Sequence, residues 1–254
     1  MRPRVSPAPA AAAENPDPIG GVFAALAGLS AVKLPHPAPP CPRASPRFTV
    51  DPEEAVWVGC EPKRLYNAGA KELFAVDRPY NDFLWLESGE FVISSGKEVG
   101  FPEPGSGGSG PDGAAPLVFR AAVSMSQLVR LFPGTGGGLF LAVKRSDATV
   151  ELTWMEIGGG KGQGRLKTVG VTAGPIAAVA GDAKTAYFAR GREIFRRTEA
   201  GEELWARHDS EDVDDLAYAP DGSLYFATTS GVGTLRGRTM FGLLKLSQPW
   251  IAIR

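Results

Sequence analysis

A short pattern of apolar runs and turns recurs five times between residues 47 and 228 of this chain. In each copy an apolar residue is followed by a turn rich in Gly, Pro, Asp or other polar residues, and then by a second apolar run that usually carries an aromatic residue. The copies are RFTVDPEEAVWVG, FAVDRPYNDFLWLE, LVRLFPGTGGGLFLAV, IAAVAGDAKTAYFAR and VDDLAYAPDGSLYFAT. In four copies an apolar residue of the first run lies nine residues before the aromatic residue of the second run, as Val179 does before Phe188. In the fifth copy the separation is ten residues, from Leu216 to Phe226. Self-similarity of this kind predicts one supersecondary unit that is stacked several times.

Each copy continues into further short apolar segments. A third segment follows every copy (RLYN, EFVIS, ATVELTWMEI, REIFRR and VGTLRG), and a fourth is visible after several (KELF, RLKTVGV, EELWARH and FGLLKLS). Four short strands joined by turns are the unit of a propeller blade. We therefore predict an all-β fold, a β-propeller, with a β-sandwich built from hairpins as the structural alternative.

The spacing of the copies sets the expected number of blades. The second-run aromatics lie at positions 57, 85, 140, 188 and 226, in steps of 28, 55, 48 and 38 residues. Propeller blades commonly repeat every ~40–50 residues, so the first step is too short for four full strands. The count is therefore five blades, or six if residues 114–130 contain a degenerate copy. Trp57 and Trp85 are expected in the core between blades.

Residues 1–47 differ in composition from the rest, because Pro and Ala dominate them. Extended polyproline II structure is typical of such segments, and we expect a largely disordered or surface-packed arm before a propeller at 48–254. Within the arm, the apolar stretch Ile19–Val32 follows Asp17 and Pro18, which favours a short capped helix too short to span a bilayer. The arm either tethers the propeller or docks on a partner.

The compartment stays open between the cytoplasm and the periplasm or exterior, since no clear signal peptide is present. Cys41 and Cys60 form a disulfide in an exported protein, or are two unrelated thiols in a cytosolic one. The C-terminal segments GLLKL and WIAIR are expected to pair with the first strand around Phe48 and so close the ring, because unpaired sheet edges promote aggregation.

Charge and residue counts exclude several classes of function. The chain carries 27 basic and 28 acidic residues, a balance that argues against a general nucleic-acid binder. Only His36 and His208 are present, so a His-rich zinc site is excluded. The run GGGKGQGR has Gly162 where a phosphate loop needs Ser or Thr, and no G-x-S-x-G elbow occurs. We assign no catalytic residue and no cofactor on these grounds.

One stretch carries a family resemblance. VDDLAYAPDGSLYFATTSGVGTL resembles the blade motif of NHL, two-component-regulator, virginiamycin-B-lyase-like, SMP-30/gluconolactonase and strictosidine-synthase-like propellers, and DPEEAVWVGC is a second match. The resemblance implies the propeller fold for the whole domain. These families include sensors, scaffolds, hydrolases and lyases, so the resemblance does not choose a function.

The acidic run from His208 to Asp215 is the densest group of carboxylates. SMP-30-like enzymes hold a divalent cation in the central channel with Asp, Asn and Glu from different blades, and the resemblance makes Asp214 the candidate metal ligand. The corresponding positions of other blades carry Val129, Arg130 and Ala177, so the alternative is a solvated acidic loop. A virginiamycin-B-lyase-like mechanism would use His208 as a general base, together with Glu211 or Asp214.

From these features we expect a non-enzymatic interaction or scaffold module, WD40-like, that binds a partner protein through one propeller face. Two alternatives remain. One is an SMP-30- or virginiamycin-B-lyase-like, cation-dependent hydrolase or lyase, and the other is an extracytoplasmic sensor or ligand-binding propeller. No nucleic-acid partner and no transmembrane segment are expected, and the oligomeric state is left open.

Overall fold

The computed structural model describes residues 47–53, 55–67, 72–106, 114–146, 148–158 and 164–245. These residues form twenty β-strands and no helix. The predicted arm, its helix and Cys41 lie outside the described residues. None of the described segments is a helix of the length and apolarity needed to cross a membrane.

The strands form five consecutive units of four, which we call blades 1 to 5. Blade 1 comprises β1 (Arg47–Val50), β2 (Val56–Glu61), β3 (Arg64–Asn67) and β4 (Glu72–Val76). Blade 2 comprises β5 (Asp82–Trp85), β6 (Phe91–Ser95), β7 (Glu98–Pro104) and β8 (Ala115–Ser124). Blade 3 comprises β9 (Val129–Pro133), β10 (Gly138–Ser146), β11 (Thr149–Ile157) and β12 (Gly164–Ala173). Blade 4 comprises β13 (Val179–Gly181), β14 (Ala186–Arg190), β15 (Glu193–Thr198) and β16 (Gly201–Arg207). Blade 5 comprises β17 (Asp215–Tyr218), β18 (Leu224–Thr228), β19 (Gly231–Arg236) and β20 (Thr239–Lys245).

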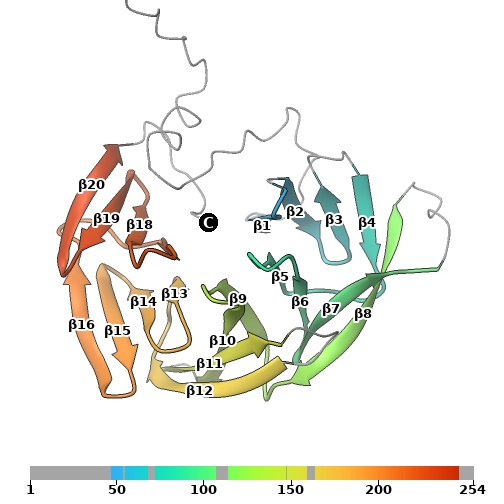
Figure 1. Ribbon diagram of the computed structural model, residues 1–254, viewed down its shortest axis with the longest axis horizontal. Coiled ribbons are helices and arrows are strands. Elements are labelled where there is room, and N and C mark those ends of the chain that lie inside the picture. Colours follow the sequence, from blue (N-terminus) through green and yellow to red (C-terminus); the bar gives the residue numbers. More distant parts are fainter. Residues whose placement is uncertain are drawn as a thin grey trace, which may run out of the picture. The chain divides into compact units, whose positions relative to one another are not determined.

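Neighbouring strands within each blade are antiparallel, and the first strand of each blade is the innermost (Figure 1). Contacts between innermost strands join β1 to β5, β5 to β9, β9 to β13 and β13 to β17. The blades therefore follow one another around a ring in sequence order, as the repeat predicts, and the propeller expectation is confirmed. The sandwich alternative is wrong, because successive sheets stand side by side around the ring and do not form two layers.

The core lies between the blades. Four clusters of buried apolar side chains fill the junctions of blades 1 and 2, 2 and 3, 3 and 4, and 4 and 5. Phe83, Phe140 and Phe188 are among the largest fully buried side chains, and each of them belongs to a strand of such a junction. The alternation of buried and exposed residues along the strands follows from this, because each face of a blade meets a different neighbour.

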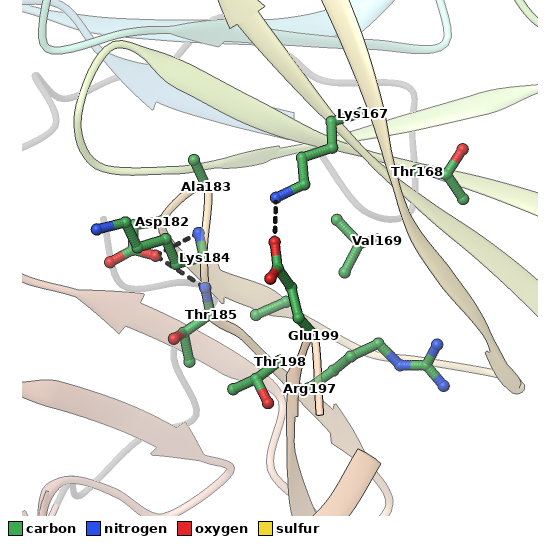
Figure 2. A pocket seen from close by; sticks show the side chains of 11 residues that line it. Lys167, Thr168, Val169, Asp182, Ala183, Lys184, Thr185, Arg197, Thr198 and Glu199 are labelled. Carbon is green, nitrogen blue, oxygen red and sulfur yellow. Dashed lines mark hydrogen bonds and ion pairs between the residues drawn. The ribbon is translucent and has the colours of Figure 1, made fainter. Parts of the chain in front are cut away.

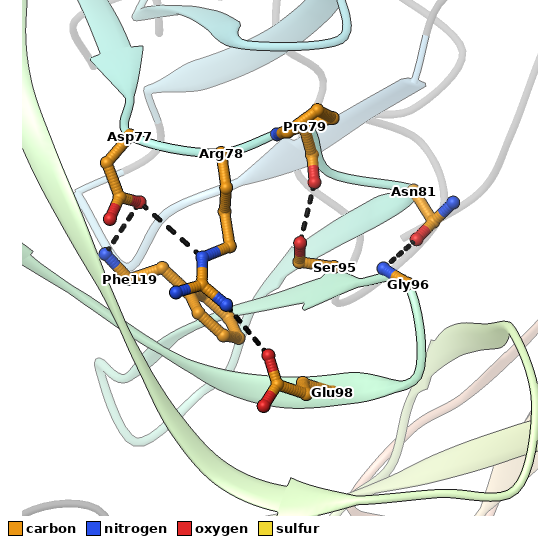
Figure 3. Close-up of polar contacts among 8 residues, drawn as sticks. All are labelled: Asp77, Arg78, Pro79, Asn81, Ser95, Gly96, Glu98 and Phe119. Atoms are coloured by element: carbon orange, nitrogen blue, oxygen red, sulfur yellow. Dashed lines mark hydrogen bonds and ion pairs between the residues drawn. The ribbon is translucent and has the colours of Figure 1, made fainter.

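Blades 1 and 2 are joined by main-chain pairing as well as by packing. The first residues of β8 run parallel to β4, with Phe74 opposite Ala115 and Val76 opposite Leu117, which makes one eight-stranded sheet. Figure 3 shows the polar contacts beside this seam. The Phe119 N–H donates to Asp77 Oδ1 over 3.1 Å, and Arg78 pairs with Glu98 at 2.7 Å while stacking on the Phe119 ring.

The structure corrects the register of the second repeat. Val76 ends the outermost strand of blade 1, and Trp85 lies on the innermost strand of blade 2, so these residues do not form a first and second run of one blade. The true second strands begin at residues 56, 91, 138, 186 and 224, a spacing of 35 to 48 residues. The short step of 28 residues between Trp57 and Trp85 arose because Trp57 lies on a second strand and Trp85 on an innermost strand. Trp57 is buried as expected, whereas Trp85 is partly exposed.

Two further expectations are settled among the described residues. Residues 114–130 form β8 and the start of β9, so they contain no additional copy, and the described residues make five blades. Residues 242–245 of the segment GLLKL belong to β20, which pairs with β19 as the outermost strand of blade 5, and Leu246 lies outside the described residues. The expectation that it pairs with the first strand is wrong, because it completes its own blade. The segment WIAIR lies outside the described residues.

Candidate functional site: the connection face

One face of the propeller gathers the links between blades. It is formed by the connections at residues 77–81, 125–128, 174–178 and 208–214, together with the turn between the second and third strands of each blade. We call it the connection face. Because strands alternate in direction within a blade, these two kinds of segment must lie at the same end of the strands.

Main-chain hydrogen bonds tie each connection to the turn of the blade it leaves. The Tyr80 N–H donates to Pro62 O, that of Met125 to Lys97 O, that of Gly174 to Ala148 O and that of His208 to Arg192 O, all within 2.7 to 2.9 Å. The repetition of one bond in four blades makes this face rigid at its base. Functional side chains placed on these connections would therefore be held in position by the scaffold.

The connection His208–Asp214 carries the sequence-predicted site. Its Glu211 carboxylate accepts the Ser230 hydroxyl at 2.8 Å and the Ser230 N–H at 3.3 Å, across to the turn of blade 5. Hydrogen bonds from Thr228 and Ser230 lower the pKa of Glu211 below its usual value. The carboxylate is thus favoured in its ionised form, and its oxygens accept the hydrogen bonds that fix the connection to the turn of blade 5.

His208 is a poor general base in this arrangement. Its Nδ1 accepts the Glu211 N–H at 3.0 Å, so the lone pair of the neutral ring is occupied and the proton resides on Nε2. The ring also packs edge-on against Phe226, with centroids 5.8 Å apart. The predicted role of His208 as a base does not agree with this geometry, because Nδ1 already accepts a hydrogen bond from the Glu211 N–H of the same connection.

Asp214, the last residue of the connection before the innermost strand of blade 5, remains open to solvent. Its N–H donates to Ala227 O at 2.8 Å, and its Oδ2 accepts the Thr229 hydroxyl at 3.3 Å. Partial desolvation raises the pKa of Asp214 above its usual value, and the neighbouring charges of Asp212 and Glu211 add to the increase. An accessible carboxylate with a raised pKa is a better proton acceptor than an ordinary surface Asp.

Asp82, the first residue of the innermost strand of blade 2, escaped the sequence reasoning, and its equivalent in blade 5 is Asp215, the last residue of the acidic run. Asp82 is 4% exposed, and it accepts the Phe83 N–H at 3.1 Å and, across the blade junction, the Leu131 N–H at 3.0 Å. Asp215 accepts the Leu216 N–H at 2.9 Å in the same way, so Asp82 and Asp215 are equivalent. The misplaced register of the second repeat concealed this equivalence.

The corresponding position on the innermost strand of blade 3 carries a cation, Arg130. Arg130 of blade 3 donates to Ile176 O at 3.4 Å and to Ala177 O at 3.5 Å, with its guanidinium over the Phe132 ring. A guanidinium between carboxylate-bearing blades opposes the binding of a divalent cation by charge repulsion.

The cation site of SMP-30-like enzymes therefore does not fit the residues present. No three His, Cys, Asp or Glu side chains come together as ligands anywhere in the described part of the chain. The ligand role of Asp214 remains a prediction with no second or third ligand beside it among those residues.

A separate pocket lies at the opposite end of the strands, between blades 3 and 4 (Figure 2). The Lys167 ammonium pairs with Glu199 at 3.1 Å across it, and Asp182 accepts the N–H groups of Lys184 and Thr185 at 2.7 and 2.8 Å. Arg197, which also lines the pocket, pairs with Glu202 at 2.8 Å, so the charged groups of the lining other than the exposed Lys184 ammonium are already engaged. None of the sequence-predicted site residues lines it.

Comparison with solved structures confirms the fold. No protein-family model and no curated protein matches the chain. A gluconolactonase from Xanthomonas campestris aligns with a TM-score of 0.55 at 10% identity, covering 82% of this chain and 77% of that one. A calcium-binding protein, regucalcin, from Agrobacterium tumefaciens aligns with a TM-score of 0.51 at 12% identity, covering 78% and 74%. At these identities the likeness shows a β-propeller fold and no more.

The comparisons correct the leading functional expectation. The expected non-enzymatic, WD40-like interaction module is contradicted, because the two solved structures described above are a gluconolactonase and regucalcin. The expectation was wrong because it rested on the absence of a catalytic pattern in the sequence. In a propeller, a site is assembled from connections that are far apart along the chain, so such a pattern is not visible there.

Proposed function

We propose that the chain is a hydrolase that opens lactones or related cyclic esters of small polar molecules at its connection face. The observation that carries this is Asp214, a solvent-accessible carboxylate with a raised pKa on the connection just before the innermost strand of blade 5. The fold, which is similar to that of a gluconolactonase, supports the same class of reaction.

Asp214 would act as the general base. Its carboxylate takes a proton from a water molecule, and the resulting hydroxide attacks the ester carbonyl carbon. The bond between the carbonyl carbon and the ring oxygen then breaks, and the leaving alkoxide takes up the proton, which gives a hydroxy acid. The Thr229 hydroxyl, which donates to Oδ2, holds the carboxylate in orientation. No step uses a divalent cation, since the described residues do not assemble its ligands.

The pH dependence of hydrolysis tests the role of Asp214. The base acts only when ionised, so kcat/KM should rise with pH through the pKa of Asp214, which lies above its usual 3.8. Asp212→Asn removes a neighbouring negative charge, so the rise should move to lower pH. Initial rates from a pH-stat on five- and six-membered sugar lactones, after treatment with EDTA, provide the measurement.

Matched variants separate catalysis from folding. Asp214→Asn should lower kcat/KM by about 100-fold or more, the usual contribution of a general base, whereas Asp209→Asn on the same connection should leave it unchanged. Circular dichroism would show that both variants fold. If no lactone is hydrolysed by the natural chain, with or without added Ca²⁺, Mg²⁺, Mn²⁺ or Zn²⁺, the proposal is overturned. Equal rates for Asp214→Asn and the natural chain would remove Asp214 from the mechanism.

A further inference from the structure

Two tyrosine rings meet across the junction of blades 4 and 5. Tyr187 of β14 and Tyr218 of β17 have ring centroids 5.7 Å apart, with an angle of 32° between the ring planes. Both residues are partly exposed, so each ring is accessible to solvent along part of its surface. Among the described residues no other two tyrosines are in ring contact. The two rings are therefore a distinctive pair in this chain.

The pair lies at the end of the strands opposite the connection face. Tyr187 is the second residue of β14, just after the turn at residues 182–185, and Tyr218 is the last residue of β17. This position is separate from that of Asp214, so a change at either tyrosine leaves the proposed hydrolytic site in place. A bond between the rings would join the second strand of blade 4 to the innermost strand of blade 5.

Both phenols can lose an electron without the loss of a hydrogen bond within the protein. In the described part of the chain, neither hydroxyl has a hydrogen-bond partner. Burial raises the pKa of both phenols, and the negative charge of Asp182 adds to the increase in each, whereas Arg196 opposes it. Because the phenols are thus neutral at physiological pH, removal of an electron is accompanied by loss of the O–H proton, for which the Asp182 carboxylate is a nearby acceptor.

Positive charges around the neighbouring Trp205 direct oxidation towards the tyrosines. The Trp205 ring lies edge-on to that of Tyr187, with centroids 5.9 Å apart. The guanidiniums of Arg196 and Arg238 lie over the indole, 4.7 and 5.0 Å from its centroid. Two positive charges oppose the formation of a positively charged radical on the indole by electrostatic repulsion. An electron lost from Trp205 is therefore replaced by one from Tyr187.

We propose that Tyr187 and Tyr218 are an oxidative cross-linking site, at which a carbon–carbon bond between the two rings joins blade 4 to blade 5 and stabilises their junction. The oxidant is hydrogen peroxide, used by a haem peroxidase. Each phenol loses one electron and its O–H proton and becomes a phenoxyl radical. The radicals couple at the ring carbons next to the C–O carbons, which then release their hydrogens as protons while the phenolic oxygens are reprotonated. The two electrons and two protons that are removed go to hydrogen peroxide, whose O–O bond breaks to give two water molecules.

Peroxidase treatment of the full chain at low protein concentration tests the site. Single chains should lose the mass of two hydrogens and gain the blue fluorescence of dityrosine. After digestion with trypsin, the cross-link should join peptide 185–190, which contains Tyr187, to peptide 208–236, which contains Tyr218. Tyr187→Phe and Tyr218→Phe should each abolish the cross-link. Tyr225→Phe is the matched control, because Tyr225 lies in the same tryptic peptide as Tyr218, and this variant should cross-link as the natural chain does.

The melting temperature gives a second readout. Before oxidation, Tyr187→Phe should melt at the temperature of the natural chain, because the ring is kept. After oxidation, the natural chain and Tyr225→Phe should melt about 5 °C or more higher, since the new bond restricts the unfolded chain, and Tyr187→Phe should show no such increase.

Several outcomes would overturn the proposal. These are a cross-link that persists in Tyr187→Phe, cross-links that join two chains in place of the two rings of one chain, and addition of oxygen at Trp205 without the loss of two hydrogens. An unchanged melting temperature of the cross-linked chain would show that the bond does not stabilise the junction.

Discussion

Asp82 serves as a structural link between blades, whereas Asp214, next to its equivalent in blade 5, is open to solvent. Both carboxylate oxygens of Asp82 accept main-chain N–H groups, one within blade 2 and one from blade 3. Asp214, beside the equivalent position in blade 5, accepts only a side-chain hydroxyl and stays open to solvent. Carboxylates at related places in the repeat therefore differ in burial and in hydrogen bonding, because their surroundings differ.

The link made by Asp82 can be measured. Asp82→Ala leaves the buried Leu131 N–H without an acceptor, which should lower the free energy of unfolding by about 1–3 kcal/mol. Asp221→Asn serves as the control, because Asp221 also accepts an N–H, from Ser223 at 2.9 Å, but is exposed. Urea denaturation compares the two. An equal decrease in the free energy of unfolding in both variants would show that the hydrogen bond from Leu131 to Asp82 adds no more stability than an exposed one.

At the scale of single elements, irregularities in the strands make room for neighbouring blades. The ladder between β11 and β12 shifts register at Leu152/Thr153, and Gly170 lies opposite Leu152 with a φ of +146°. A Cβ at Gly170 would collide with the guanidinium of Arg197, which donates to Val171 O at 3.0 Å. The bulge therefore allows a side chain of blade 4 to bond to the outermost strand of blade 3.

Substitution of two glycines separates this collision from backbone strain. Gly170 and Gly201 both have positive φ, but only Gly170 lacks space for a Cβ. Gly201→Ala should cost about 1–2 kcal/mol from the backbone conformation alone. Gly170→Ala should cost more, because it also displaces Arg197. Thermal unfolding of both variants gives the difference, and equal losses would contradict a role for the bond to Val171.

At the scale of the whole molecule, stability depends on the junctions, since every core cluster lies between two blades. Blades 1 and 2 have an additional main-chain connection through β4 and β8. The junction of blades 3 and 4 has a main-chain hydrogen bond from the Thr135 N–H to Gly181 O at 2.9 Å, and Phe140, Trp154 and Phe188 pack at its centre.

Phe188→Ala should therefore destabilise the whole propeller. Loss of a fully buried aromatic ring costs about 3–5 kcal/mol, which corresponds to a decrease in Tm on the order of 10 °C. Differential scanning calorimetry should show one lowered transition if the blades unfold together. Two separate transitions, with blades 4 and 5 melting first, would show that the junctions act independently.

The amino-acid sequence by itself determined the all-β class, the four-stranded unit and the propeller, because these depend on the local alternation of apolar residues and on turn-forming residues that recur along the chain. It did not determine the register of the second repeat, since Trp85 in an innermost strand and Trp57 in a second strand look alike locally. Only the tertiary structure decided which residues meet at the connection face. The bond from Leu131 to Asp82 joins residues 49 positions apart, and the occupied Nδ1 of His208 depends on how its connection folds. Such contacts arise from the packing of blades against one another, and no local pattern encodes them.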